Sequence, residues 1–183
     1  MRTGASAAVI GVQVSPRLPD MATAGVPITV NARTRASVER AFDAIAPIDL
    51  PRIFTGFGPL PAVAGVRDQT GDWDHVGAAR IVELAGGREA PERITAYDRP
   101  AHFAYRVGPF TGALGWLVRE ADGAWWFSSG VSGTEIRWNY TFRPRPHAAV
   151  LVRIFIAPLW RRYARRALGL AVGIVEDEPS AVR

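Results

Sequence analysis

The side chains of this sequence that could do chemistry are a few charged and phenolic residues in strand-like segments. Arg80 and Glu92 each alternate with apolar residues in their own segments, 77–84 and 89–97, so each charge shares a strand face with apolar side chains. A buried charge without a partner is costly, which predicts an inward ion pair between them. Such a pair would either fix the register of a sheet or orient a carboxylate, hydroxyl or carbonyl group of a bound molecule.

Acid–base catalysis would need a general acid or base together with a donor that stabilises an enolate. The inward polar residues that qualify are Arg80, Glu92, Tyr105 and Tyr140. Their spacing matches no catalytic motif, so the catalytic residues stay unknown. All 22 basic residues are Arg and there is no Cys, which excludes lysine Schiff bases, thiolate nucleophiles and cysteine-based metal sites.

The three histidines do not form a recognisable site. They are His75, His102 and His147, and neither an HExxH nor a GxSxG motif is present. Asp72 and Asp74 could join His75 in a metal site, but turn formation explains both carboxylates equally well. We therefore predict neither a metal nor a cofactor.

Aromatic side chains gather on the inward faces of the predicted strands, with two more on the terminal helix. They either fill a solid core or line a pocket, and the number of rings with polar tips favours a mostly apolar pocket with a few orienting hydrogen bonds. Trp73 is expected at the mouth of that pocket. The predicted ligand-binding residues are Trp73, Arg80, Glu92, Phe103, Tyr105, Trp125, Phe127, Trp138, Tyr140, Trp160 and Tyr163.

Period-two alternation predicts the strands that would position these residues. We expect strands at 27–33, 63–68, 77–84, 89–97, 101–107, 124–129 and 133–142, helices at 38–45 and 50–54, and either helix or strand at 114–119. Glycine and aspartate pairs, including Asp122-Gly123, are interpreted as turns between antiparallel neighbours. Consecutive strands with segregated helices indicate an α+β fold.

A long amphipathic helix is predicted over residues 147–176, with either a kink or a late restart of the helix at Pro158. One of its faces carries a basic surface formed by Arg161, Arg162, Arg165 and Arg166. This surface is most simply a solvated face; anionic lipid headgroups, RNA or an acidic partner are the alternatives. No aromatic platform interleaves with these arginines, so no specific nucleic acid is expected, whereas weak contact with an anionic membrane is possible.

Three sequence segments together resemble a known family. The segments GDWDHVGAAR at 71–80, LAGG at 84–87 and ERIT at 92–95 resemble the polyketide cyclase/dehydrase-like branch of the START-like, or SRPBCC, superfamily, and the segments at 103–107, 123–127 and 133–138 agree. The resemblance covers about residues 27–176.

This resemblance implies the helix-grip fold. In that fold a seven-stranded antiparallel sheet wraps around a long C-terminal helix, one or two short helices follow strand 1, and an apolar cavity lies between sheet and helix. Members bind lipids, sterols, hormones or polyketides, and a minority catalyse cyclisation or dehydration. The expected function is therefore binding of a hydrophobic or aromatic small molecule; a cyclase/dehydrase-type enzyme and an interaction module using the basic helix are the alternatives.

Length and composition fit one domain. The chain has 183 residues, 48% of them hydrophobic, with a formal charge of +5. We predict a flexible N-terminal extension over 1–26, a domain over 27–176 and a frayed tail over 177–183. The apolar run 7–14 is too short to cross a membrane and resembles no export signal, so a cytoplasmic location is expected. Either Met1 or Met21 could be the start, and the oligomeric state stays open.

Overall fold

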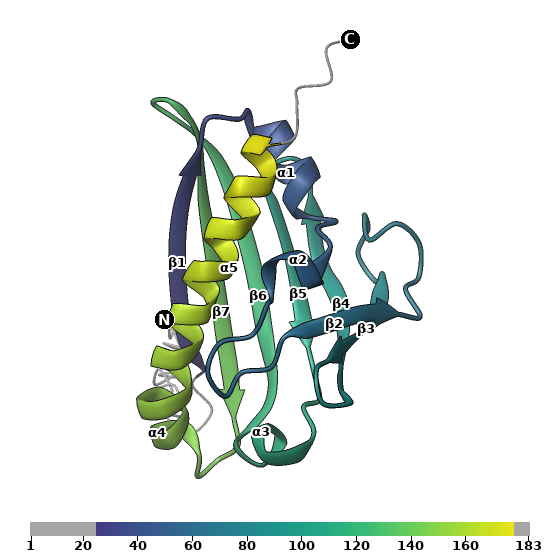
Figure 1. Ribbon diagram of the computed structural model, residues 1–183, viewed down its shortest axis with the longest axis vertical. Helices are drawn as coiled ribbons and strands as arrows, with labels where there is room; N and C mark the ends of the chain where they lie inside the picture. The colour runs from purple at the N-terminus through teal and green to yellow at the C-terminus, as the bar shows by residue number, and fades with distance from the viewer. Residues whose placement is uncertain (1–24, 178–183) are drawn as a thin grey trace, which may run out of the picture.

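The computed structural model describes residues 25–177, and its elements form one seven-stranded antiparallel sheet and a long C-terminal helix (Figure 1). The spatial order of the strands is β1-β7-β6-β5-β4-β3-β2. The elements are β1 (Val26–Thr34), α1 (Val38–Ile45), α2 (Leu50–Ile53), β2 (Val63–Arg67), β3 (Ala79–Leu84), β4 (Arg88–Asp98), β5 (His102–Val107), α3 (Gly112–Leu117), β6 (Val118–Gly130), β7 (Gly133–Pro144), α4 (Ala149–Leu151), η1 (Val152–Ile156) and α5 (Ala157–Asp177).

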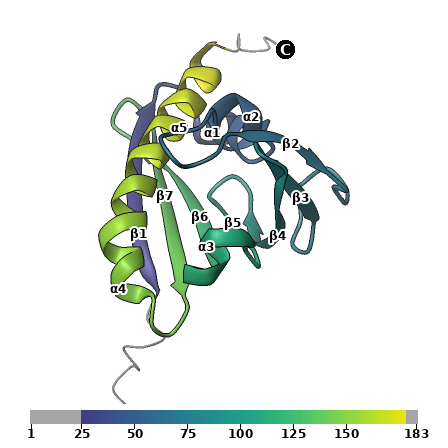
Figure 2. The same cartoon turned by 60° about the horizontal axis from the view of Figure 1, so that its bottom comes forward.

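This architecture confirms the α+β helix-grip fold. The sheet curves around α5, while α1 and α2 lie beside that helix over the same face (Figures 1 and 2). The inner stripe of α5 carries the small, fully buried residues Ala164, Ala167 and Ala171, which allow close packing against β1. On β7 strict alternation buries one face, including Ile136 and Trp138. The core therefore lies between the concave face of the sheet and the helices.

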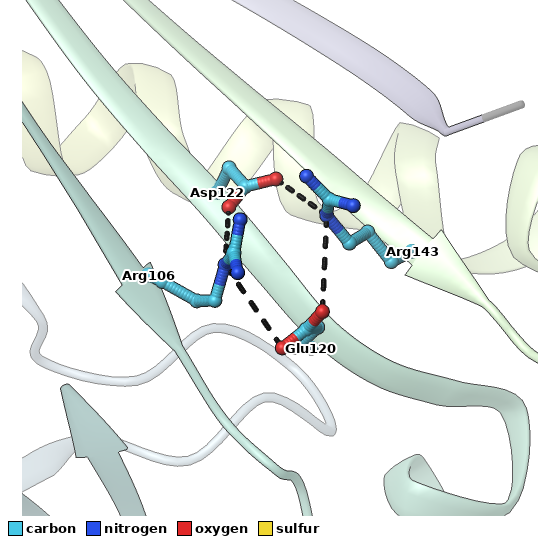
Figure 3. Close-up of polar contacts among 4 residues, drawn as sticks. All are labelled: Arg106, Glu120, Asp122 and Arg143. Carbon is cyan, nitrogen blue, oxygen red and sulfur yellow. Dashed lines mark hydrogen bonds and ion pairs between the residues drawn. The ribbon is translucent and has the colours of Figure 1, made fainter. Parts of the chain in front are cut away.

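Strand β6 departs from the prediction, because the interpretation of Asp122-Gly123 as a turn is wrong. Both residues lie inside the strand. The ring of Tyr105, on the neighbouring strand, covers Gly123, where a Cβ atom would lie only 2.2 Å from the Tyr105 Cζ atom. Asp122 points to the outer face, where its carboxylate accepts hydrogen bonds from Arg106 Nε at 2.8 Å and Arg143 Nε at 2.6 Å (Figure 3). Contacts with both neighbouring strands thus keep this dipeptide extended.

Replacing Gly123 with Ala is expected to lower the free energy of unfolding by about 1–3 kcal/mol, because the new methyl group displaces the Tyr105 ring. Urea denaturation followed by circular dichroism measures the loss. Gly169→Ala is the matched control, since its position on α5 has open space and tolerates or favours Ala. If both variants were as stable as the wild type, the close packing of Tyr105 on Gly123 would be wrong.

The terminal helix accommodates Pro158 without ending. A π-helical turn, η1, precedes the proline, and the Ala157 N–H donates to the Val152 carbonyl five residues earlier. Because proline has no N–H to donate to the Ile154 carbonyl, the wider turn takes up the irregularity at this point. Among residues 25–177, no helix is long and apolar enough to cross a membrane. The sequence predictions on residues 1–24 and 178–183 lie outside the described residues.

Candidate functional site

A cavity of about 340 Å³ lies between the concave face of the sheet and the helices. Its wall combines inward residues of β3 to β7 with residues of α2, α3, η1 and α5. The structure places most of the predicted ligand-binding residues on this wall, namely Trp73, Arg80, Glu92, Phe103, Tyr105, Trp125, Tyr140, Trp160 and Tyr163. Phe127 and Trp138 do not line it and pack in the core behind it.

A buried ion pair occupies part of this wall. Arg80 and Glu92 lie directly opposite each other on β3 and β4, and Arg80 Nε donates to Glu92 Oε2 at 2.7 Å. Each side chain is 6% exposed, whereas the side chains of every other ion pair in the described part of the chain are at least 30% exposed. The predicted pairing is therefore present, within a mostly apolar cavity wall that also includes Arg88, Glu89 and Thr111.

Trp73 covers this ion pair from the loop between β2 and β3. The Arg80 Cζ atom lies 3.8 Å from the centre of the indole ring, a cation–π contact, and Trp73 is 2% exposed. Trp73 adopts a φ of 58°, an uncommon backbone conformation for a large side chain. Reciprocal hydrogen bonds between Thr70 and Ala79 close the loop around it. The loop therefore turns Trp73 inward onto Arg80.

Burial controls the ionisation of the groups around the pair. It raises the pKa of Glu92, although the charge and hydrogen bond of Arg80 oppose the shift. Burial also raises the pKa of Tyr105 and Tyr140, and the Glu92 charge adds to both shifts. The two phenols therefore keep their protons at neutral pH, so that each hydroxyl is available as a hydrogen-bond donor.

Two aromatic residues of α5 have different polar roles in the wall. The Tyr163 hydroxyl accepts from the Gly56 N–H at 2.9 Å and donates to the Pro61 carbonyl at 3.1 Å, so it fixes the loop between α2 and β2. The indole N–H of Trp160 is buried and has no hydrogen-bond partner among residues 25–177. Because a buried unpaired donor is unfavourable, Trp160 offers an acceptor group of a bound molecule a favourable partner.

Sequence reasoning missed the residues that α2 and α3 contribute to the wall. Leu50 and Ile53 reach the cavity from α2, with Phe54 directly after that helix, and Leu114 and Leu117 reach it from α3. Leu114 and Leu117 are three residues apart, which is a helical spacing and was the available signal. They lie in a glycine-containing segment for which either a helix or a strand was predicted.

The remaining sequence-predicted groups lie away from the cavity. His75 is exposed and contacts Asp74, with 2.8 Å between Nδ1 and the carboxylate. The basic surface of Arg161, Arg162, Arg165 and Arg166 lies on the exposed side of α5, opposite the stripe that packs on the sheet.

The sequence of residues 26–173 matches the family model described as "Polyketide cyclase / dehydrase and lipid transport". The chain belongs to this family. Its predicted place in the START-like, or SRPBCC, superfamily is thereby confirmed. Among proteins with curated descriptions, none matches this member of the polyketide cyclase/dehydrase and lipid-transport family by sequence.

Several solved structures share the fold of this family member at low sequence identity. Ara h 8.0201 superposes with a TM-score of 0.67 and 14% identity, over 85% of this chain and 100% of that one. BexL, a di-domain ARO/CYC protein from the BE-7585A biosynthetic pathway, gives 0.63 and 15%, over 85% of this chain and 51% of its own length. XoxI from Bacillus cereus gives 0.60 and 14%, over 82% and 96%. At these identities the likeness concerns the fold alone, and the chain spans about half of BexL.

Proposed function

We propose that this family member binds a hydrophobic or aromatic small molecule that carries one or two polar groups. The observation that supports this most strongly is a mostly apolar cavity of about 340 Å³ with one buried ion pair in its wall. Ligand sites are typically concave, mostly apolar and supplied with few polar groups, and this volume lies at the small end of their usual range. We keep the cytoplasmic location as a prediction.

The polar groups of the wall suggest which molecules fit. Arg80 uses Nε toward Glu92, and a guanidinium has five N–H donors in all, so further donors are available to a carbonyl or carboxylate oxygen. The unpaired N–H of Trp160 suits a second acceptor. The preferred ligand is therefore an apolar body with oxygen acceptors, held between β3 and α5.

Native mass spectrometry of gently purified protein tests this proposal. A stoichiometric bound mass is expected, and denaturation releases the molecule for identification. Ala90→Phe fills space in the cavity wall and should abolish the bound mass, whereas Ala104→Phe, on the opposite face of the sheet, should retain it. If the wild type carried no mass and bound 1-anilinonaphthalene-8-sulfonate no better than Ala90→Phe, the proposal would be wrong.

A second candidate function is catalysis of cyclisation or dehydration on the bound molecule. It is favoured by Glu92, a cavity-wall carboxyl group whose pKa is raised by burial and which can therefore act as a proton donor or acceptor closer to neutral pH. Turnover of a short poly-β-ketone by the wild type, lost in Glu92→Gln or Tyr105→Phe, would support it. Turnover that is absent, or retained in both variants, would exclude this role of the two residues.

A further inference from the structure

The outward side of the terminal helix carries an exposed apolar cluster that continues into a row of arginines. The cluster consists of Val150, Leu151, Ile154 and Phe155, which are 62%, 46%, 57% and 65% exposed. The row consists of Arg153, Arg161, Arg162, Arg165 and Arg166, all exposed. The exposed positions follow the helical repeat from Ile154 and Phe155 through Pro158 to the later arginines. The positions between them face the sheet.

This row of arginines has no acidic counterpart. Residues 144–175 contain no Asp or Glu. None of the five arginines forms an ion pair with another described residue, unlike Arg33, Arg67 and Arg99 elsewhere on the surface. An uncompensated row of positive charge attracts an anionic surface.

The adjoining apolar cluster decides which anionic surface fits. A nucleic acid or an acidic peptide in extended form would satisfy the arginines but leave four large apolar side chains in water. A lipid surface satisfies both, because apolar side chains enter below the headgroups while the arginines contact anionic headgroups. The helices α3 and α4 lie at the same end of the molecule (Figure 1). On α3, Trp116 is 77% exposed, and Arg145, shortly before α4, donates from Nε to the Gly115 carbonyl at 2.6 Å.

We propose that this face of the terminal helix docks on anionic membranes, with Ile154 and Phe155 inserted and the arginine row in contact with the headgroups. The inner side of the same helical turns lines the cavity through Ile156 and Leu159. Docking thus brings a lipid surface within one helix diameter of the cavity wall. The docking itself does not depend on the cavity being filled.

Vesicle co-sedimentation tests the docking. Vesicles of phosphatidylcholine with about one quarter phosphatidylglycerol should retain the wild-type protein at low salt, and vesicles of phosphatidylcholine alone should not. Ile154→Ser/Phe155→Ser should weaken binding by at least about tenfold. Reversal of Arg161, Arg162, Arg165 and Arg166 to Glu should weaken it by more than about a hundredfold. Val131→Ser, an exposed apolar residue in the turn between β6 and β7, is the matched control and should bind as the wild type does.

Three outcomes would overturn the proposal. In the first, the wild-type protein does not bind the anionic vesicles. In the second, the double Ser variant and the charge-reversal variant both bind them as strongly as the wild type. In the third, the double Ser variant binds fully while the charge-reversal variant does not bind. The last outcome would assign the face to a soluble polyanion, which RNA binding by the same variants would then reveal. Denaturation curves that match the wild type show that the variants fold. Binding of 1-anilinonaphthalene-8-sulfonate that matches the wild type in the absence of vesicles shows that a variant has lost membrane docking and not the cavity.

Discussion

Replacing Arg80 with Met is expected to lower the free energy of unfolding by about 3–5 kcal/mol at neutral pH. The substitution leaves the Glu92 carboxylate only 6% exposed and without its cation. Both effects of Arg80 on Glu92 lower its pKa, so their removal raises the pKa further above the unfolded value of 4.5. Urea denaturation at several pH values measures the loss.

The pH dependence of this variant has a defined sign. Between the unfolded and the raised folded pKa of Glu92, the folded state holds a proton that the unfolded state has released. The contribution of this group is therefore fully present below about pH 4.5 and is lost as the pH rises through the folded value. A deficit of Arg80→Met that was equal at acidic and neutral pH would contradict this explanation.

The double variant Arg80→Met/Glu92→Leu separates stability from recognition. Replacing both members of a buried pair by apolar residues of similar size is often neutral or stabilising, so most of the lost stability should return. A ligand oxygen that binds Arg80 would lack its partner in both variants, so the bound mass that native mass spectrometry detects for the wild type should be absent from Arg80→Met and from the double variant. Wild-type affinity in the double variant would show that the pair serves the sheet register alone.

Truncation of Trp138 to Ala is expected to cost about 3–5 kcal/mol of unfolding free energy. Trp138 is 1% exposed and stacks on Trp125 with 4.5 Å between ring centres, and it meets Phe54, Tyr140 and Trp160 edge-on. The neighbouring rings cannot all collapse into the space that it leaves. Thermal and urea denaturation measure the loss.

Two further variants make this result specific. Trp138→Phe keeps an aromatic ring in the same place and leaves a smaller space, so its cost should be clearly smaller. Trp160→Ala should also cost less, because Trp160 is less buried and already borders empty space. Equal losses for Trp138→Ala and Trp160→Ala would mean that the cavity is filled at Trp160.

The sequence was most informative where one periodic pattern decides the structure. The alternation in residues 133–142 predicts β7 and its inward aromatic face, because only one register buries that face. The same argument paired Arg80 with Glu92. It failed at Asp122-Gly123, where two residues of low strand propensity are held extended by side chains from neighbouring strands. Such tertiary contacts leave no local pattern.

The cavity wall likewise combines residues that a local sequence pattern predicts with residues that depend on tertiary contacts. Its strand residues follow from alternation, but the contributions of α2 and α3 depend on how far each helix stands from the sheet. Trp73 was expected at the mouth of the pocket, and the structure places it, buried, on the Arg80 guanidinium. Its left-handed backbone turns the ring inward, and nothing in the residues around it predicts that conformation for a tryptophan.

We expect residues 149–156 of the terminal helix to open separately from α5, because the two segments are held to the core by very different amounts of buried surface. Within residues 148–156, only Ala148 and Val152 are buried, whereas α5 is held by a full buried stripe. Segments with few buried contacts open with a much smaller free energy than the whole protein. Opening of residues 149–156 releases Ile156 from the cavity wall while α5 stays docked. We therefore expect that a molecule bound in the cavity would exchange at this end through fraying of one helical segment, without unfolding of the sheet.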